Sequence, residues 1–278
     1  MLMKKIFTLI ATAALAISAN AETKTVEITV TWPMAESYQE QAVDKDTNEP
    51  LFNEDGTPQM TTKYKYDFTP VVSANAECIT VGEPVLGSEI SWKEARGINN
   101  VAFATFYPST QLKKVDDISD DHTVSFSLET KEGYTFEPTG FDYLGSVIGT
   151  DGGNYNLTYT WNGATETLQS EFHPNRNNEA NNYYSDVKLP IEGATAASGK
   201  FVVTFYPYNL ANNKQIGLSA VVIKGKLTGD NLTGLTEIVA NEDAPVEYFN
   251  LQGVRVANPA NGLYIKRQGN KVEKVYVK

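Results

Sequence analysis

Cysteine, histidine and catalytic motifs are all scarce in this chain of 278 residues. The single cysteine, Cys78, excludes an intrachain disulfide framework, and its setting predicts an inert core residue. The two histidines, His122 and His173, stand far apart and outside any metal-binding motif. No G-x-S-x-G elbow, phosphate-binding loop or dinucleotide fingerprint occurs. Catalysis therefore has little support, although two carboxylates that meet only in space are left open.

Basic residues are also under-represented, with 23 lysines and arginines against 34 acidic residues and a formal net charge of -11. Such a chain repels phosphate backbones and anionic headgroups, so we expect no nucleic-acid partner and no binding to membrane surfaces. No apolar stretch approaches the roughly 20 residues that a spanning helix needs, so we expect no membrane span.

The first 21 residues have the pattern of a secretory signal peptide. Lys4 and Lys5 form a basic start, residues 6–17 are apolar, and Ala19-Asn20-Ala21 supplies a cleavage site. No cysteine follows the apolar run, which argues against a lipid anchor. Removing residues 1–21 takes away two lysines and no acid, so the formal net charge of the rest is -13. We therefore expect a secreted or cell-surface protein.

Apolar and polar residues alternate in many short segments of the remaining chain, which is typical of half-buried β-strands. The clearest runs are residues 25–32, 124–128, 155–161, 201–205 and 218–227. Asn162-Gly163 is a strong hairpin-turn signal, because both central residues of a type I′ turn need positive φ. The predicted fold class is all-β: one antiparallel β-sandwich, jelly-roll-like, over residues 22–230.

Residues 35–60 interrupt this pattern with an acidic, polar segment. We expect a surface excursion with one helical turn near Met34–Ala42. The stretch from Asp44 to Asp55 resembles a calcium-binding EF-hand loop, but Glu49 stands where that loop needs glycine. A solvated acidic loop is the preferred interpretation, no cofactor is expected, and a structural calcium ion elsewhere is left open.

Three strand-like runs close the chain at residues 248–256, 261–265 and 271–278. Their Tyr-x-Asn-x-x-Gly, Gly-x-Tyr and terminal lysine signatures resemble the C-terminal sorting tail of secreted Bacteroidetes proteins, which the type IX (Por) secretion machinery reads. The resemblance implies that residues 244–278 form a small β domain, joined by a linker at 231–243, that addresses the protein to the cell exterior. The alternative is an ordinary terminal β domain.

The middle of the chain, residues 124–226, is similar to a β-sandwich module of Bacteroidetes secreted proteins that often accompanies polysaccharide-degrading domains. The similar motifs begin at Gly133, Gly149, Pro174, Tyr206 and Lys214. The resemblance implies a carbohydrate-binding-like jelly roll. Related sequences have a basic residue just before the Gly-Thr-Asp-Gly-Gly turn, whereas Ser146-Val147-Ile148 stands there in this chain, so any ligand contact made by that residue is missing.

Polar residues near these motifs are the candidate glycan-binding residues, because amide, carboxylate and guanidinium groups bind sugar hydroxyls. The predicted binding lip consists of Asp151, Asn154, Asn175, Arg176, Asn177 and Asn178. The plainer interpretation is a solvated loop whose asparagines cap turns. Tyr159 and Trp161 lie on an alternating apolar face, so we expect them to pack in the core rather than to stack on sugar.

The leading prediction is a secreted, non-catalytic module that binds a plant or host polysaccharide and carries an export tail. The first alternative is a structural or adhesive cell-surface protein without a sugar site. The second is a small jelly-roll glycoside hydrolase or lyase. A groove lined with exposed aromatic rings would favour sugar binding, and a polar surface without such rings would not.

Overall fold

The computed structural model describes residues 23–112, 119–149, 153–176, 182–233, 246–250, 256, 259, 262–268 and 271–277. In this part of the chain the only helical residues form two short 3₁₀ turns, η1 (Ala76–Cys78) and η3 (Asp120–His122). None of its helices is long and apolar enough to cross a bilayer. The prediction of an all-β, sandwich-like fold is confirmed.

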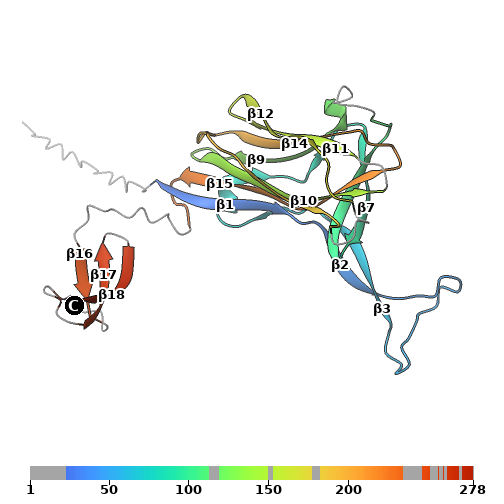
Figure 1. The fold of residues 1–278 in the computed structure, drawn as a ribbon, viewed down its shortest axis with the longest axis horizontal. Coiled ribbons are helices and arrows are strands. Elements are labelled where there is room, and N and C mark those ends of the chain that lie inside the picture. Colours follow the sequence, from blue (N-terminus) through green and yellow to red (C-terminus); the bar gives the residue numbers. More distant parts are fainter. Residues whose placement is uncertain are drawn as a thin grey trace, which may run out of the picture.

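Two antiparallel sheets form the sandwich (Figure 1). The first has the order β13-β10-β15-β1-β4, with β8 also beside β15 and β7 beside β8. Its strands are β1 (Lys24–Trp32), β4 (Val71–Val72), β7 (Ile90–Ile98), β8 (Val101–Pro108), β10 (Thr135–Ile148), β13 (Ser185–Pro190) and β15 (Gln215–Gly229). The second has the order β12-β11-β14-β9-β5, with β6 also beside β9. Its strands are β5 (Ile79–Val81), β6 (Val85–Leu86), β9 (Val124–Thr130), β11 (Asn154–Trp161), β12 (Ala164–Phe172) and β14 (Lys200–Tyr208).

The core lies between the two sheets and is rich in aromatic rings. Phe205 of β14 is its centre, with ring centroids 5.2 to 6.0 Å from four neighbours: Phe126, Phe141, Tyr143 and Tyr155. Cys78 and Trp161 are buried, as the sequence pattern predicts. The hairpin after Trp161 also forms as predicted, because Asn162 and Gly163 both have positive φ and Trp161 pairs with Ala164.

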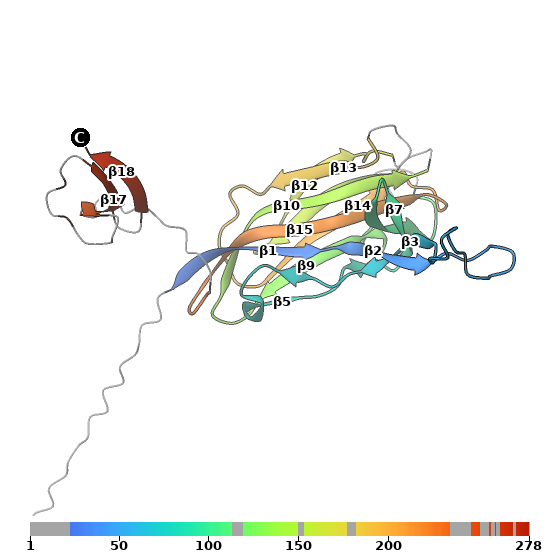
Figure 2. The same ribbon diagram turned by 90° about the horizontal axis from the view of Figure 1, so that it is seen from below.

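A two-stranded ribbon, β2 (Met34–Gln41) with β3 (Met60–Asp67), projects beyond the end of the sandwich where β1 finishes (Figures 1 and 2). The surface excursion is therefore present, but the helical turn expected near Met34–Ala42 is wrong. All eight residues of β2 pair with β3, from Met34 opposite Asp67 to Gln41 opposite Met60. Eighteen residues separate β2 from its partner strand, and this non-local pairing decides the conformation.

The ribbon leaves the first sheet because β8 takes the position that β1 occupied. β1 follows β15 as far as Trp32 opposite Val221, and β8 then pairs with β15 at Leu218. Between these two ladders Ala220 has φ 46°, and Met34, fully buried, has φ 74°. Left-handed backbone is unfavourable for residues with a side chain, so these two positions mark where the chain is forced to bend.

Aromatic packing fastens the base of the ribbon to the sandwich. The ring centroids of Tyr66 and Phe68 are 5.1 Å apart, Phe68 lies 4.6 Å from Trp92, and Trp92 lies 6.0 Å from Phe106 of the core. Burial, and secondarily the charge of Glu94, raises the pKa of Tyr66. The ribbon is thus anchored at its base, and its outer part extends away from the sandwich.

The sandwich contacts continue into the segment predicted as a linker. Leu232 is buried in the core, and the Asn75 side chain holds Thr233 through two 2.7 Å hydrogen bonds, to its backbone nitrogen and its carbonyl. The tail forms its own antiparallel sheet in the order β16-β17-β18, with β16 (Val246–Phe249), β17 (Gly262–Gln268) and β18 (Lys271–Val277). The sequence predicts a small β domain of three or four strands in this segment.

Candidate functional site

The described residues of the predicted glycan-binding lip lie at the end of the sandwich from which the ribbon projects. Asn154 begins β11, and Asn175 and Arg176 follow β12. Arg176 is half-buried and forms a parallel bridge with Val147 at the end of β10, and a ring nitrogen of His173 lies 3.0 Å from the Gly153 carbonyl. The fold therefore places the two predicted segments side by side. Asp151, Asn177 and Asn178 lie outside the described residues.

The amide groups of this lip are engaged in bracing its own turns. Asn175 Nδ2 donates to Asn182 Oδ1 at 2.6 Å and to the Tyr184 carbonyl at 3.1 Å. Asn154 Nδ2 donates to the Glu171 carbonyl at 3.4 Å, and its Oδ1 accepts from Asn209 at the same distance. For Asn154 and Asn175 the geometry therefore favours the turn-bracing interpretation over a ligand contact.

The outer faces of the two sheets carry polar side chains. The first sheet has the ion pairs Lys224–Asp142 at 2.6 Å and Lys188–Asp186 at 3.0 Å. The second sheet has a row of hydroxyl residues across four strands: Thr167, Thr158, Thr204 and Ser125. Among the described residues, no strongly exposed aromatic side chain lies on the sandwich, so neither face resembles a sugar-stacking platform.

Exposed apolar side chains concentrate on the ribbon instead. The described part of the chain has eight exposed large hydrophobic residues, and five of them belong to residues 34–67: Tyr38, Val43, Phe52, Met60 and Tyr66. Phe52 and Met60 are the most exposed of these five, at 59% and 52%. Single exposed apolar residues are ordinary, but several gathered on a projecting element indicate a contact surface. We therefore take the ribbon as the principal candidate site.

The tip of the ribbon consists of two small hairpins rather than one loop. Val43 pairs with Pro50 in the first, and Phe52 pairs with Pro58 in the second. The Asp44 carboxylate accepts hydrogen bonds from the backbone of Thr47 and Asp46, which lower its pKa. In the turn of the second hairpin, the Asp55 carboxylate likewise accepts hydrogen bonds, from Thr57. Its pKa is lowered first by the Thr57 hydroxyl, at 2.6 Å, and then by the Thr57 backbone nitrogen.

These two carboxylates therefore stabilise separate turns and do not combine as ligands of one loop. Among the described residues, no three histidine, cysteine or acidic side chains gather closely enough to hold a metal ion. The EF-hand-like spacing between Asp44 and Asp55 is thus accounted for by two local turns.

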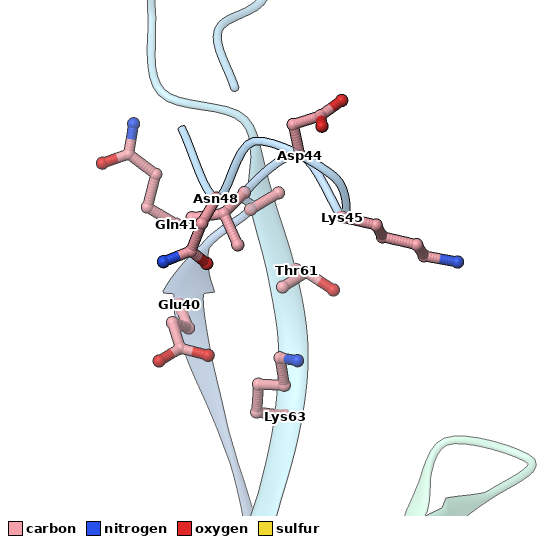
Figure 3. A pocket seen from close by; sticks show the side chains of 9 residues that line it. Glu40, Gln41, Asp44, Lys45, Asn48, Thr61 and Lys63 are labelled. Atoms are coloured by element: carbon pink, nitrogen blue, oxygen red, sulfur yellow. The ribbon is translucent and has the colours of Figure 1, made fainter. Parts of the chain in front are cut away.

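A concave surface of about 500 Å³ lies where the first hairpin joins the strands of the ribbon (Figure 3). It is lined by Glu40, Gln41, Ala42, Val43, Asp44, Lys45, Asn48, Thr61 and Lys63. Figure 3 shows the side chains of Gln41 and Lys45 directed to opposite sides. The charged groups do not converge on one point, so the cavity has the character of a contact surface rather than a catalytic site.

A smaller pocket of about 180 Å³ lies at the opposite end of the sandwich, beside the β11–β12 hairpin. Its wall includes Tyr159, Trp161, Asn162, Glu166 and Thr195. The indole nitrogen of Trp161 donates to the Thr195 carbonyl at 2.8 Å, and burial followed by the charge of Glu166 raises the pKa of Tyr159. The sequence pattern predicts a core position for both aromatic residues; Trp161 is buried, whereas Tyr159 is only partly buried.

The two histidines serve different parts of the fold. A ring nitrogen of His122 lies 2.8 Å from Glu89 Oε2, whereas His173 contacts the Gly153 carbonyl. They do not form a joint site.

No known protein family matches this chain. A search of curated proteins also finds no match.

Proposed function

We propose that this protein is an exported, non-catalytic structural or adhesive protein of the cell surface, which makes its contacts through the β2–β3 ribbon. The observation that carries the proposal is the concentration of exposed apolar residues on this projecting element. The sheet faces of the sandwich do not offer such a surface within the described residues. This function is the first of the two alternatives to glycan binding that the sequence leaves open.

The charge of the ribbon fits an exposed element that has to stay soluble before it finds its partner. Residues 34–67 contain eight acidic and three basic side chains. Near the base, Lys65 pairs with Glu36 at 2.7 Å, and its ammonium lies 5.9 Å from the ring centre of Tyr38. Charged side chains around an exposed strand pair oppose non-specific edge pairing and aggregation.

The test is a paired substitution at the ribbon tip, Phe52→Ser with Met60→Ser. We expect the fraction of the exported protein that sediments with the cell envelope to fall several-fold, because the apolar contact is lost while the fold is kept. The matched control is Glu54→Ser with Gln59→Ser, which alters exposed polar residues of the same segment. Equal retention of both variants would refute a contact role for the ribbon.

The export route is a separate prediction of this proposal. Deleting residues 244–278 is expected to leave the protein in the periplasm of a host that has type IX machinery, because the tail resembles the sorting signal. The stability of the sandwich should not change, since among the described strands β16, β17 and β18 pair with one another and with no strand of the sandwich. Immunoblots of periplasm and culture medium measure this, and normal release of the truncated protein would rule out the sorting role.

Glycan binding is retained as a second candidate, because the pocket beside the β11–β12 hairpin combines an aromatic wall with a carboxylate and an amide. A panel of plant and host polysaccharides tests it. We expect the protein to be retained on one of the polysaccharides. Tyr159→Ala should abolish this retention, whereas Thr158→Ala, on the other face of the same strand, should not. Failure to bind any polysaccharide of the panel would remove this candidate.

A further inference from the structure

Seven of the eight exposed large hydrophobic residues of the described chain lie on just two surfaces. Five are on the ribbon, and two, Val71 and Val85, are on the edge of the sandwich where β4 and β6 lie. We name the latter surface the β4/β6 edge, defined by Val71, Val72, Val85 and Leu86. Val71 is 57% exposed and Val85 is 62% exposed. The segment 73–78 connects β4 to β5 directly, so the two sheets end on the same side there.

The β4/β6 edge also leaves strand backbone without a neighbouring strand. β4 pairs only with Val30 and Thr31 of β1, and Ser73 bonds Thr29 beyond it. Among the described strands, none pairs with Lys24–Ile28 on that side. β6 is equally short and pairs only with Val124 and Ser125 of β9. An incompletely covered strand edge is a template for strand addition from another chain.

The ribbon also combines unpaired strand edges with exposed apolar side chains. Each of its strands bonds the other along one side only, so each has an outward row of backbone groups beyond the anchored base. Three of its exposed apolar residues, Val43, Phe52 and Met60, lie at or beside the tip, and Figures 1 and 2 show that the ribbon extends away from its own sandwich. The tip therefore points away from the sandwich of its own chain, where a second molecule can reach it.

We propose that the ribbon of one copy docks on the β4/β6 edge of a second copy. This inference rests on the proposed function and specifies the partner. The two surfaces are different, so the contact is heterologous, and each added copy presents a free ribbon or a free edge for the next. The product is an open, head-to-tail assembly, which suits a structural protein of the cell exterior.

The charge of the chain sets how this assembly depends on salt. From residue 22 onward every copy carries a formal net charge of -13, because the total of -11 includes Lys4 and Lys5, so copies repel one another at low ionic strength. Added salt screens this repulsion and leaves the apolar contact intact. We expect association to strengthen between low and physiological salt, which is the opposite of what a contact between oppositely charged surfaces would show.

The experiment is sedimentation velocity of the chain from residue 22 onward, from about 1 µM to about 1 mM, a range that covers weak interfaces. The wild type is expected to rise in weight-average mass at least two-fold across the range. Phe52→Ser with Met60→Ser should remain monomeric, and so should Val71→Ser with Val85→Ser. Glu54→Ser with Gln59→Ser should assemble as the wild type does.

Mixing the two monomeric variants is the decisive measurement. The ribbon variant keeps an intact edge and the edge variant keeps an intact ribbon, so a one-to-one mixture should form dimers and nothing larger. A monomeric wild type at all concentrations, or a mixture that stays monomeric, would overturn the inference. If the wild type is monomeric but the ribbon variant is still released from cells, the ribbon binds another molecule and the proposed function stands. If the wild type stays monomeric and the ribbon variant is retained on cells as the wild type is, both proposals fail.

Discussion

Replacing Phe205 by alanine is expected to lower the free energy of unfolding by about 3 to 5 kcal/mol, the range for truncating a large aromatic core residue. Phe205 is fully buried and contacts rings from both sheets, including Phe141 of the first and Tyr155 of the second. Its removal leaves a cavity that the sheets on either side cannot close. Domains of this kind typically have a total stability of about 5 to 15 kcal/mol, so the variant should be near the limit of folding.

Chemical denaturation monitored by tryptophan fluorescence measures this effect. Val202→Ala is the matched control, because Val202 belongs to the same strand and faces outward between Phe201 and Val203, which are buried. It should cost about 1 kcal/mol or less, which is the centre of the distribution for single substitutions. Similar losses for both variants would mean that Phe205 is not the centre of the core.

Alkaline pH is expected to unfold the protein through two buried tyrosines. Tyr155 donates a 2.9 Å hydrogen bond to Tyr143, which donates to Gln169 Oε1 at 2.8 Å. Burial raises the pKa of both phenols above the usual value of 10, and that of Tyr155 well above it. Below pH 10 both folded and unfolded chains keep these protons, so these two tyrosines add no pH dependence to the stability. As the pH rises above 10 only the unfolded chain loses them, and stability falls.

The free energy of unfolding is expected to fall by about 1.4 kcal/mol per pH unit for each tyrosine, because the unfolded chain then binds one proton fewer per tyrosine than the folded chain. Denaturation midpoints measured from about pH 9 to about pH 12 test this decline, because this range includes the ordinary phenol pKa of about 10. Tyr155→Phe should make the decline shallower by about one residue's contribution, while Tyr38→Phe, on the exposed ribbon, should leave it unchanged. A decline that Tyr155→Phe does not reduce would contradict this account.

The local sequence pattern predicts the sandwich because buried and outward-facing residues alternate along its strands. In β14, Phe201, Val203 and Phe205 are buried and alternate with outward residues, and the periodicity is visible without knowing the partner strand. The Asn162-Gly163 turn is equally local. The ribbon was predicted as an excursion but not as strands, because β2 acquires its conformation from β3 across an 18-residue separation and from the bend at Met34 and Ala220.

The candidate site was less accessible to sequence reasoning. The asparagine-rich lip was selected for its chemistry, but hydrogen-bond partners that are distant in sequence decide whether an amide is free. Asn154, for example, contacts Asn209. The apolar residues of the ribbon lie in an acidic segment with no period, where Val43, Phe52 and Met60 look like isolated exceptions. Their recurrence within a polar stretch was the available signal, and only the fold shows that they belong to one projecting element.

The direct continuation of β1 into β2 determines where mechanical load goes. A pulling force on the ribbon passes through Pro33 into β1, whose nine residues pair with β15 in the interior of the first sheet. The component of the force that is directed along β1 loads the hydrogen bonds of this ladder together in shear rather than opening them one after another. A protein built in this way resists tension at the point where the ribbon meets the sandwich.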